Sequence, residues 1–299
     1  MKNWNPTLFV LALACTVAAA AADAPKLTFT FTKTGVPGAV QTGPSGINNA
    51  GVVVGGYVDK KSVSHGYILQ GKKLTTLDDP KGVAGSTGAE NLNPDGPIWV
   101  VGAYNNSSGN SVGFLYKNGK YTDIPGPTGA VSSVASAIND QGSIVGDYVD
   151  SNGRTHGFLL KDKKYTTLDV PAAFGTTAAS GINNAGWIVL WWVDQQGLVE
   201  SSITKDNGNT YDTIDVPGAA DSYASGLNRA GDVTYFWFNS AGAGQGALLH
   251  AGKCYKFHYP TSIFTYAGGI NDRRTLVGGY QFKGKNGHPP LLGYKATYK

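Results

Sequence analysis

The sequence predicts an all-β protein, a closed six-bladed β-propeller with four antiparallel strands in each blade. Three observations lead to this prediction. The chain has 42 glycines, 16 tyrosines and 11 phenylalanines but a single methionine, which is typical of strands and tight turns rather than of helices. A similar segment recurs about every 45 residues, and it contains four strand-like runs. The last copy lacks its fourth run, whereas one unassigned strand precedes the first copy.

Each copy of the repeat contains an asparagine that serves as a reference point. These residues are Asn48, Asn93, Asn139, Asn183, Asn228 and Asn271, with successive spacings of 45, 46, 44, 45 and 43 residues. A regular repeat of this length is typical of propeller blades or solenoid units, which bury their apolar faces only when they stack on their neighbours. The repeat continues almost to the end of the chain without a linker. We therefore expect one domain over residues 23–299.

The third copy shows the elements of one blade in order. Residues 133–139 form a short strand of small and apolar residues, which a turn containing Gly142 joins to an apolar strand at 143–148. A polar connection leads to a third strand at 156–160, and the fourth strand at 164–170 is rich in β-favouring Tyr and Thr. By comparison with this copy we place the six blades near residues 45–79, 87–125, 133–170, 177–216, 222–260 and 264–299.

The two ends of the chain indicate that the ring closes. The sixth copy stops at Lys299, where its fourth strand should begin. Residues 27–32, with the alternating sequence LTFTFT, belong to no complete copy. We expect this strand to complete the last blade, because the exchange removes exposed sheet edges, and neither a solenoid nor an open array requires it.

Residues 1–22 resemble a secretory signal peptide. Lys2 precedes an apolar run that ends in three alanines before Asp23. This run is shorter than the roughly 20 residues that a spanning helix needs, and no later segment is a candidate, so we expect no membrane span and a secreted or periplasmic location. An alternative is a lipid anchor at Cys15, since residues 13–15 resemble a lipobox. Loss of Cys15 with the signal leaves Cys254 alone, without an internal disulfide.

The charge pattern and the missing motifs disfavour several function classes. The chain has 24 basic and 20 acidic residues, a net charge of +4, and no run of Lys or Arg, which disfavours nucleic acid or an anionic membrane as the main partner. No hydrolase GxSxG, phosphate-binding GxxxxGK[ST] or metal-binding HxH, CxxC or DxDxDG pattern occurs. We therefore expect no metal and no cofactor, and we expect a monomer.

Part of the third copy resembles a known bacterial family. The runs 138–142, 144–150 and 156–160 resemble the extracellular repeats named for a His-Ala-Phe tripeptide, the HAF-repeat family. Glycine takes the middle position here, in the tripeptides at 156–158 and 65–67. The resemblance covers nearly all of the chain after residue 45. It implies secretion and a repeat architecture, and it implies no particular activity.

One polar group recurs between copies and therefore suggests structure more than chemistry. Tyr148, Asp150 and His156 flank one connection, and the same residue types recur as Tyr57, Asp59 and His65. An Asp with a His across a hairpin could form an acid/base pair or a metal site. Recurrence favours hydrogen bonds that close the hairpin, because each blade needs a structural device whereas a protein needs a catalytic centre once.

Aromatic residues set the fourth, fifth and sixth copies apart. Where other copies have Gly and then Tyr on the second strand, the fourth has Leu190 and Trp192, and the fifth has Tyr235 and Trp237. The innermost strands of the fifth and sixth copies carry Tyr223 and Tyr266, five residues before the reference asparagine. Exposed Trp and Tyr rings suit the C–H faces of sugars. The alternative for Trp191, Trp192 and Trp237 is packing between blades, since adjacent strand residues face opposite sides and one side is buried. Tyr223 and Tyr266 are expected nearest the axis.

Two further residues depart from the repeat. Three residues before the reference asparagine the other copies have Ser or Gly, whereas the second copy has Glu90. A carboxylate in a central channel could act as a general base or bind a ligand hydroxyl, and the alternative is a solvated acid in a wet tunnel. In the sixth copy His288 stands before two prolines and is a candidate acid/base group.

Two functions of different classes fit these departures. The first is a secreted binding module for a glycan or a cell-surface polymer, with Glu90, Trp192, Tyr223, Trp237, Tyr266 and His288 as ligand-binding residues. The second is an extracellular polysaccharide lyase or hydrolase that uses Tyr, His and Glu groups near the channel. The sequence leaves open whether the protein is an enzyme, because propellers host many unrelated functions. A purely structural envelope protein is the remaining alternative.

Overall fold

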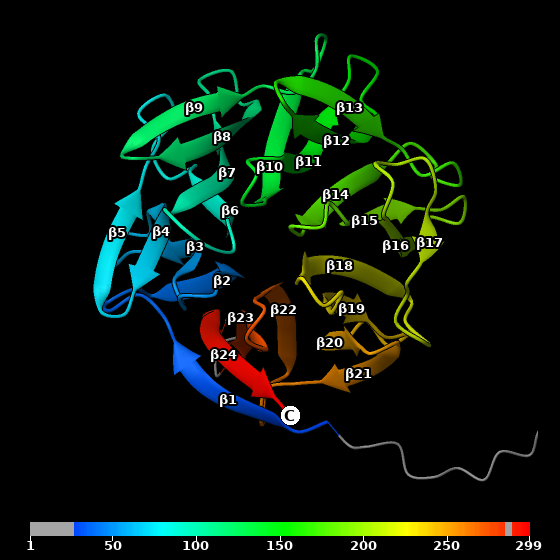
Figure 1. Cartoon of the computed structure of the whole chain (residues 1–299). Helices are drawn as coiled ribbons and strands as arrows, with labels where there is room; N and C mark the ends of the chain where they lie inside the picture. Colours follow the sequence, from blue (N-terminus) through cyan, green and yellow to red (C-terminus); the bar gives the residue numbers. More distant parts are fainter. Residues whose placement is uncertain (1–26, 285–288) are drawn as a thin grey trace, which may run out of the picture.

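The computed structural model describes residues 27–284 and 289–299 of the chain. Six four-stranded antiparallel sheets stand around a central axis, each with its first strand nearest the axis (Figure 1). This arrangement confirms the predicted six-bladed β-propeller.

The first three blades follow the order of the sequence from the axis outward. Blade one consists of β2 (Gln41–Ile47), β3 (Val53–Val58), β4 (Ser64–Gln70) and β5 (Lys73–Leu77). Blade two consists of β6 (Gly88–Leu92), β7 (Trp99–Asn105), β8 (Ser111–Lys117) and β9 (Lys120–Ile124). Blade three consists of β10 (Ser132–Ile138), β11 (Ile144–Val149), β12 (Thr155–Lys161) and β13 (Lys164–Leu168).

Blades four to six repeat this plan, and the last one takes its outer strand from the start of the chain. Blade four consists of β14 (Thr177–Ile182), β15 (Ile188–Val193), β16 (Val199–Thr204) and the short β17 (Asp212–Thr213). Blade five consists of β18 (Asp221–Leu227), β19 (Val233–Phe238), β20 (Gly244–His250) and β21 (Lys253–Phe257). Blade six consists of β22 (Phe264–Ile270), β23 (Thr275–Gln281), β24 (Leu292–Tyr298) and β1 (Phe29–Thr34).

The pairing of β1 with β24 closes the ring as the sequence predicts. The two strands are antiparallel and lie side by side in Figure 1. The strand ends at Thr34, two residues beyond the predicted range of 27–32. Phe29 and Phe31, on one face of the strand, pack against Phe257 of blade five with ring centroids 4.5 and 6.0 Å apart. The closing strand therefore joins blade six to blade five as well as completing its own sheet.

The apolar core lies between blades. One cluster combines Val189 and Ile203 of blade four with Leu227, Val233 and Trp237 of blade five. Each blade thus buries its apolar faces against its two neighbours, which is the packing expected of a repeat protein.

The reference asparagines hold the turns and join the blades. Asn139 is 3 % exposed, and its Oδ1 accepts a hydrogen bond of 3.0 Å from the backbone N–H of Ser143. Its Nδ2 donates to the backbone carbonyl of Asn183 in the next blade, at 3.2 Å. The same inter-blade bond runs from Asn183 to Asn228, from Asn228 to Asn271, and from Asn271 to Asn48. The last of these crosses the seam where the ring closes.

The recurring Tyr, Asp and His groups have the structural role that recurrence favours. Asp150 Oδ1 accepts backbone N–H bonds from Asn152 at 2.8 Å and from Arg154 at 2.9 Å, which closes the hairpin loop. His156 Nδ1 lies 2.8 Å from Asp169 Oδ2, so the imidazole joins the hairpin to the segment after the fourth strand. Asp59, His65 and Asp78 repeat this arrangement in blade one.

Several sequence predictions concern residues outside the described ranges. Residues 1–22, Cys15 among them, and His288 are outside, so the signal peptide, the lipid anchor and the role of His288 stay predictions. Over the described ranges, no helix has the length and apolar character required to cross a bilayer.

Candidate functional site

Each innermost strand contains a β-bulge, at the residue three places before the reference asparagine. In blade two, Ala89 pairs with Gly102 and Asn91 with Val101, so Glu90 has no partner on β7. A bulge leaves one residue outside the ladder and redirects its side chain. The bulged residues are Ser45, Glu90, Ser136, Ser180, Ser225 and Gly268, the last together with Gly269.

All six bulge positions line one cavity of about 330 Å³ on the axis. This volume lies at the lower end of the range for small-molecule sites, about 300 to 1,000 Å³. The cavity also contains Tyr223 and Tyr266, so both tyrosines lie near the axis as predicted and share one space with Glu90. The other aromatic lining residues are Trp191, Phe236 and Phe264. Blades four to six thus form an aromatic wall, and blades one to three a polar one.

The aromatic wall is continuous from blade four to blade six. The ring of Tyr223 lies 5.5 Å from Trp191, edge to face, and 6.0 Å from Phe236, nearly parallel. Phe236 in turn contacts Phe264 at 5.4 Å and Tyr266 at 6.5 Å between centroids. Each of these rings is half-buried, so part of each face is open to the cavity.

Tyr266 is fixed at the end of this wall. Its hydroxyl donates a hydrogen bond of 3.0 Å to the backbone carbonyl of Pro44 in blade one. Burial, and secondarily the nearby Glu90, raise the pKa of Tyr266, so its phenol stays protonated. Tyr266 therefore contributes a fixed, neutral ring to the cavity lining, and its hydroxyl proton is already used in the hydrogen bond to blade one.

Trp192 and Trp237 do not belong to this wall, and here the structure corrects the prediction. Their side chains are only 8 % and 4 % exposed. Trp192 donates its indole N–H to Ser202 Oγ at 3.0 Å, and Trp237 donates to the backbone carbonyl of Gly246 at 3.2 Å. The equivalent Tyr280 of blade six is 1 % exposed, so this strand position is a packing position. The two tryptophans are therefore packing residues, which is the alternative that the sequence analysis gave for them.

Cross-strand pairing explains why the neighbouring residues Trp191 and Phe236 reach the cavity instead. Tyr223 on β18 pairs with Phe236 on β19, and directly opposite residues of an antiparallel pair share a face. Trp191 has the equivalent place on β15, opposite Ala178. Because Tyr223 was expected near the axis, cross-strand pairing could have predicted that Phe236 and Trp191 also reach the cavity. Comparing the copies along single strands did not reveal this.

A second carboxylate missed by the sequence analysis stands close to Glu90. Asp147 on β11 pairs with Val134, in the same register as Phe236 and Trp191. At this position the six copies have Gly56, Ala103, Asp147, Trp191, Phe236 and Gly279, so Asp147 is the one charged residue among them. This departure from the repeat could have identified Asp147 from the sequence.

Both carboxyl groups have raised pKa values. Glu90 is open to cavity solvent, but the ring encloses it, and this desolvation raises its pKa. Burial, and then the charge of Glu90, raise the pKa of Asp147 to about 7. Two neighbouring blades thus place two interacting acids beside the axis, opposite the aromatic wall.

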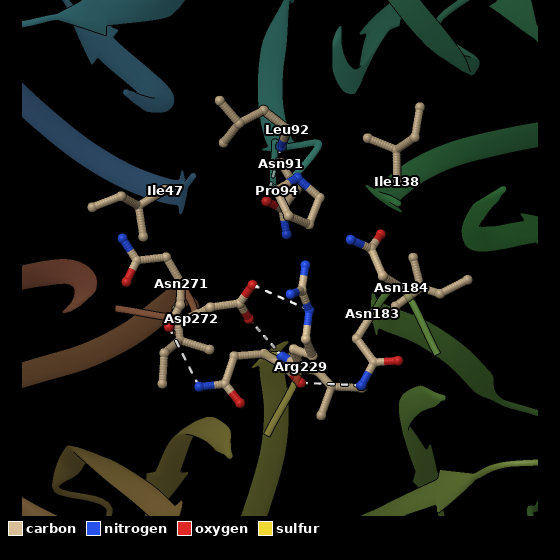
Figure 2. Close-up of a pocket in the computed structure, with 15 residues that line it drawn as sticks. Ile47, Asn91, Leu92, Pro94, Ile138, Asn183, Asn184, Arg229, Asn271 and Asp272 are labelled. Atoms are coloured by element: carbon tan, nitrogen blue, oxygen red, sulfur yellow. Dashed lines mark hydrogen bonds and ion pairs between the residues drawn. The ribbon is translucent and has the colours of Figure 1, made fainter. Parts of the chain in front are cut away.

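The other end of the axis is nearly filled. The space beside the asparagine turns has a volume of only about 30 Å³, roughly one water molecule's share of liquid volume. Figure 2 shows the side chain of Arg229 projecting across this space, between Asp272, Pro94 and Asn184. Its guanidinium lies 3.7 Å from carboxylate oxygens of both Asp95 and Asp272. A ligand the size of a sugar therefore fits the cavity end of the axis and not the asparagine end.

Comparisons with known proteins find the fold and no sequence family. No family model matches the chain, and no curated protein matches it in sequence. TolB from Acinetobacter baumannii is similar in structure, with 12% identity and a TM-score of 0.60 over 82% of this chain and 65% of that one. A protein of unknown function from Dyadobacter fermentans has 12% identity and a TM-score of 0.58 over 92% and 100%. The Trypanosoma rangeli sialidase has 10% identity and a TM-score of 0.53 over 91% and 59%.

These likenesses show the propeller fold alone, because proteins this distant in sequence share architecture without sharing sites. The resemblance to the HAF-repeat family stays a prediction.

Proposed function

We propose that the protein is a glycan-binding β-propeller whose axial cavity holds a small sugar unit. One observation carries the proposal: an aromatic wall and a polar wall face each other across a single cavity of about 330 Å³. Sugars present apolar C–H faces that stack on aromatic rings and hydroxyls that need polar partners. A secretory signal at residues 1–22 would agree with this role, since cell-surface glycans lie outside the cell membrane.

The polar groups that line the cavity differ in whether they already have hydrogen-bond partners in the protein. Ser45 Oγ already donates to the carbonyl of Ala89 at 2.7 Å, and Ser180 Oγ donates to the carbonyl of Ala224 at 2.5 Å. These hydroxyls join neighbouring blades and can offer a ligand only acceptor lone pairs. Glu90, with two carboxylate oxygens, is therefore the group that we expect to fix the orientation of a bound sugar.

Two adjacent tryptophans provide a matched test of the proposal. We expect Trp191→Ala to weaken glycan binding at least about tenfold, because it removes one stacking surface, equivalent to about 1.4 kcal/mol. Trp192→Ala should leave the lining of the cavity in place but lower stability by about 3–5 kcal/mol, since it removes a buried side chain.

The measurement is a glycan array followed by calorimetric titration of the strongest hit, with urea unfolding of each variant. Unchanged affinity in Trp191→Ala, or an array without a hit, would reject the proposal. Loss of stability alone in Trp191→Ala would assign that ring to packing.

A glycan-cleaving enzyme is the second candidate, and the Glu90–Asp147 pair favours it. Cleavage of a glycosidic bond commonly uses two carboxyl groups, one of which holds a proton for the leaving group. With a pKa raised to about 7, Asp147 can hold that proton near neutral pH, and Glu90 would act as the base.

Incubation with neutral and uronate polysaccharides, followed by assays for new reducing ends and unsaturated products, tests this function. Glu90→Gln and Asp147→Asn should each abolish turnover while binding persists. Binding without turnover on any polymer would rule the enzyme out and leave the binding module.

A further inference from the structure

We propose that the axial cavity selects a ligand group that carries positive charge, so that the glycan it holds contains a free, protonated amine. The proposal rests on the glycan-binding function and names its ligand class. The charged groups at the cavity are acidic: Glu90 lines it, and Asp147 interacts with Glu90. Among the lining residues that the structure describes there is no lysine or arginine.

The remaining groups around the axis do not offset this negative charge. The phenols of Tyr223 and Tyr266 stay neutral, because burial raises the pKa of each. Arg229 lies at the asparagine end, where Asp95 and Asp272 already surround its guanidinium. The field within the cavity is therefore negative, and enclosure by protein strengthens it relative to the same charges at an open surface.

The aromatic wall attracts the same sign of charge. The faces of Trp191, Tyr223 and Phe236 carry the negative side of the ring quadrupole, which attracts an ammonium group within about 6 Å of the ring centroid. An amino sugar would gain from both walls at once, with its C–H face and ammonium near the rings and its charge near Glu90. A neutral sugar would gain the stacking and hydrogen bonds to Glu90 but no attraction between charges, and a uronate would be repelled by the two carboxylates.

Affinity should therefore depend on pH in one direction. Among the described residues beside this site, Asp147 has a pKa raised to about 7, and the pKa of its neighbour Glu90 is also raised. Loss of the Asp147 proton adds a negative charge, so a cation should bind more tightly at about pH 8 than at about pH 6, by up to about tenfold. A quaternary ammonium probe keeps its own charge constant over this range, so the change would come from the protein.

The experiment compares probes that share one sugar ring. Methyl glucosaminide carries an ammonium, methyl N-acetylglucosaminide and methyl glucoside are neutral, and methyl glucuronide is anionic. Calorimetric or NMR titration of the full chain should give the ammonium probe at least about tenfold higher affinity than either neutral probe, and the uronide the lowest affinity. Tetramethylammonium serves as the probe without a sugar.

Isosteric variants assign the effect to the two acids. In Glu90→Gln combined with Asp147→Asn, we expect the ratio of affinities between the ammonium probe and the neutral probes to fall to about one, whatever the loss of the Glu90 hydrogen bonds does to the affinity of all the sugars. Near-UV circular dichroism and urea unfolding show whether the double variant is folded. A preference that survives in the double variant would overturn the assignment to these residues.

The outcomes separate this inference from the proposed function. Equal binding of neutral and ammonium sugars would overturn the charge selection and support glycan binding. Binding of tetramethylammonium without binding of any sugar would overturn glycan binding and support charge selection. Failure of every probe to bind at millimolar concentration would overturn both.

Discussion

Asp147 and Glu90 are held in an environment that opposes their ionisation. Burial raises the pKa of both groups, that of Asp147 to about 7. An acid whose pKa is higher in the folded state takes up a proton on folding, so its contribution to stability is full below the unfolded pKa of about 4 and is lost as the pH rises through the folded pKa. Such groups are common at functional sites, where activity requires a local loss of stability.

The pH dependence of stability tests this account of Asp147. Asp147→Asn should raise the melting temperature at about pH 8 by on the order of 2 °C and have little effect at about pH 4, because the variant removes a charge that is unfavourable only when ionised. Thermal unfolding from about pH 4 to about pH 8.5 measures this.

Asp150→Asn is the matched control, three residues along the chain. The backbone N–H of Arg154 is the main cause of the lowered pKa of Asp150, so its charge is favourable and the substitution should lower the melting temperature at about pH 8. A lower melting temperature for Asp147→Asn under the same conditions would contradict the account.

At the scale of the strand, the turn asparagine and the bulge have separate roles three residues apart. The asparagine side chain satisfies backbone groups of its own turn and of the next blade, as Asn139 does with Ser143 and Asn183. The bulged residue takes no part in the ladder and lines the cavity. Each innermost strand thus has a structural residue where it ends, the asparagine, and a cavity-lining residue at its bulge.

Asn139→Ala should therefore destabilise the protein by about 2–4 kcal/mol, because it leaves the buried backbone N–H of Ser143 without its partner and removes the inter-blade bond to the carbonyl of Asn183. Asn152→Ala, at an exposed loop position, should change stability by less than about 0.5 kcal/mol. Urea unfolding should show a lower midpoint for Asn139→Ala with an unchanged m-value. Equal midpoints for the two variants would argue against the inter-blade role.

At the scale of the whole molecule, β1 is the element that makes the ring a closed body. It pairs with β24 over its full length, and its phenylalanines pack on Phe257 of blade five. Without it, the edge of β24 would be unpaired and aromatic surface of two blades would be exposed.

A variant that begins at Gly35 should lose cooperative unfolding and aggregate, whereas one that begins at Leu27 should behave as the full chain does. Light scattering and thermal unfolding distinguish the two. A monomeric, cooperatively unfolding protein without β1 would show that blade packing alone closes the ring.

The number of blades, the order of their strands and the closure of the ring could be predicted because their evidence is periodic. Six asparagines at regular spacing and one missing strand determine the blade number and the closure. The positions of Glu90, Tyr223 and Tyr266 at the axis could be predicted because each lies a fixed number of residues before the reference asparagine. The prediction was wrong for Trp192 and Trp237 and missed Trp191 and Phe236, because strand alternation places adjacent residues on opposite sides without saying which side packs against the next blade.

The bulge has a consequence for how such a chain can diversify. A bulged residue has no partner in the ladder, so position 90 can change while the ring stays the same, whereas Ser45 and Ser180 also bond to neighbouring blades. In blade order, the six bulge positions of this chain hold Ser, Glu, Ser, Ser, Ser and Gly. Counting three residues back from each reference asparagine would identify the corresponding six positions in any chain built on this frame. Chains with different residues at these positions should recognise different ligands, so the positions serve both for comparing such chains and for redesigning their specificity.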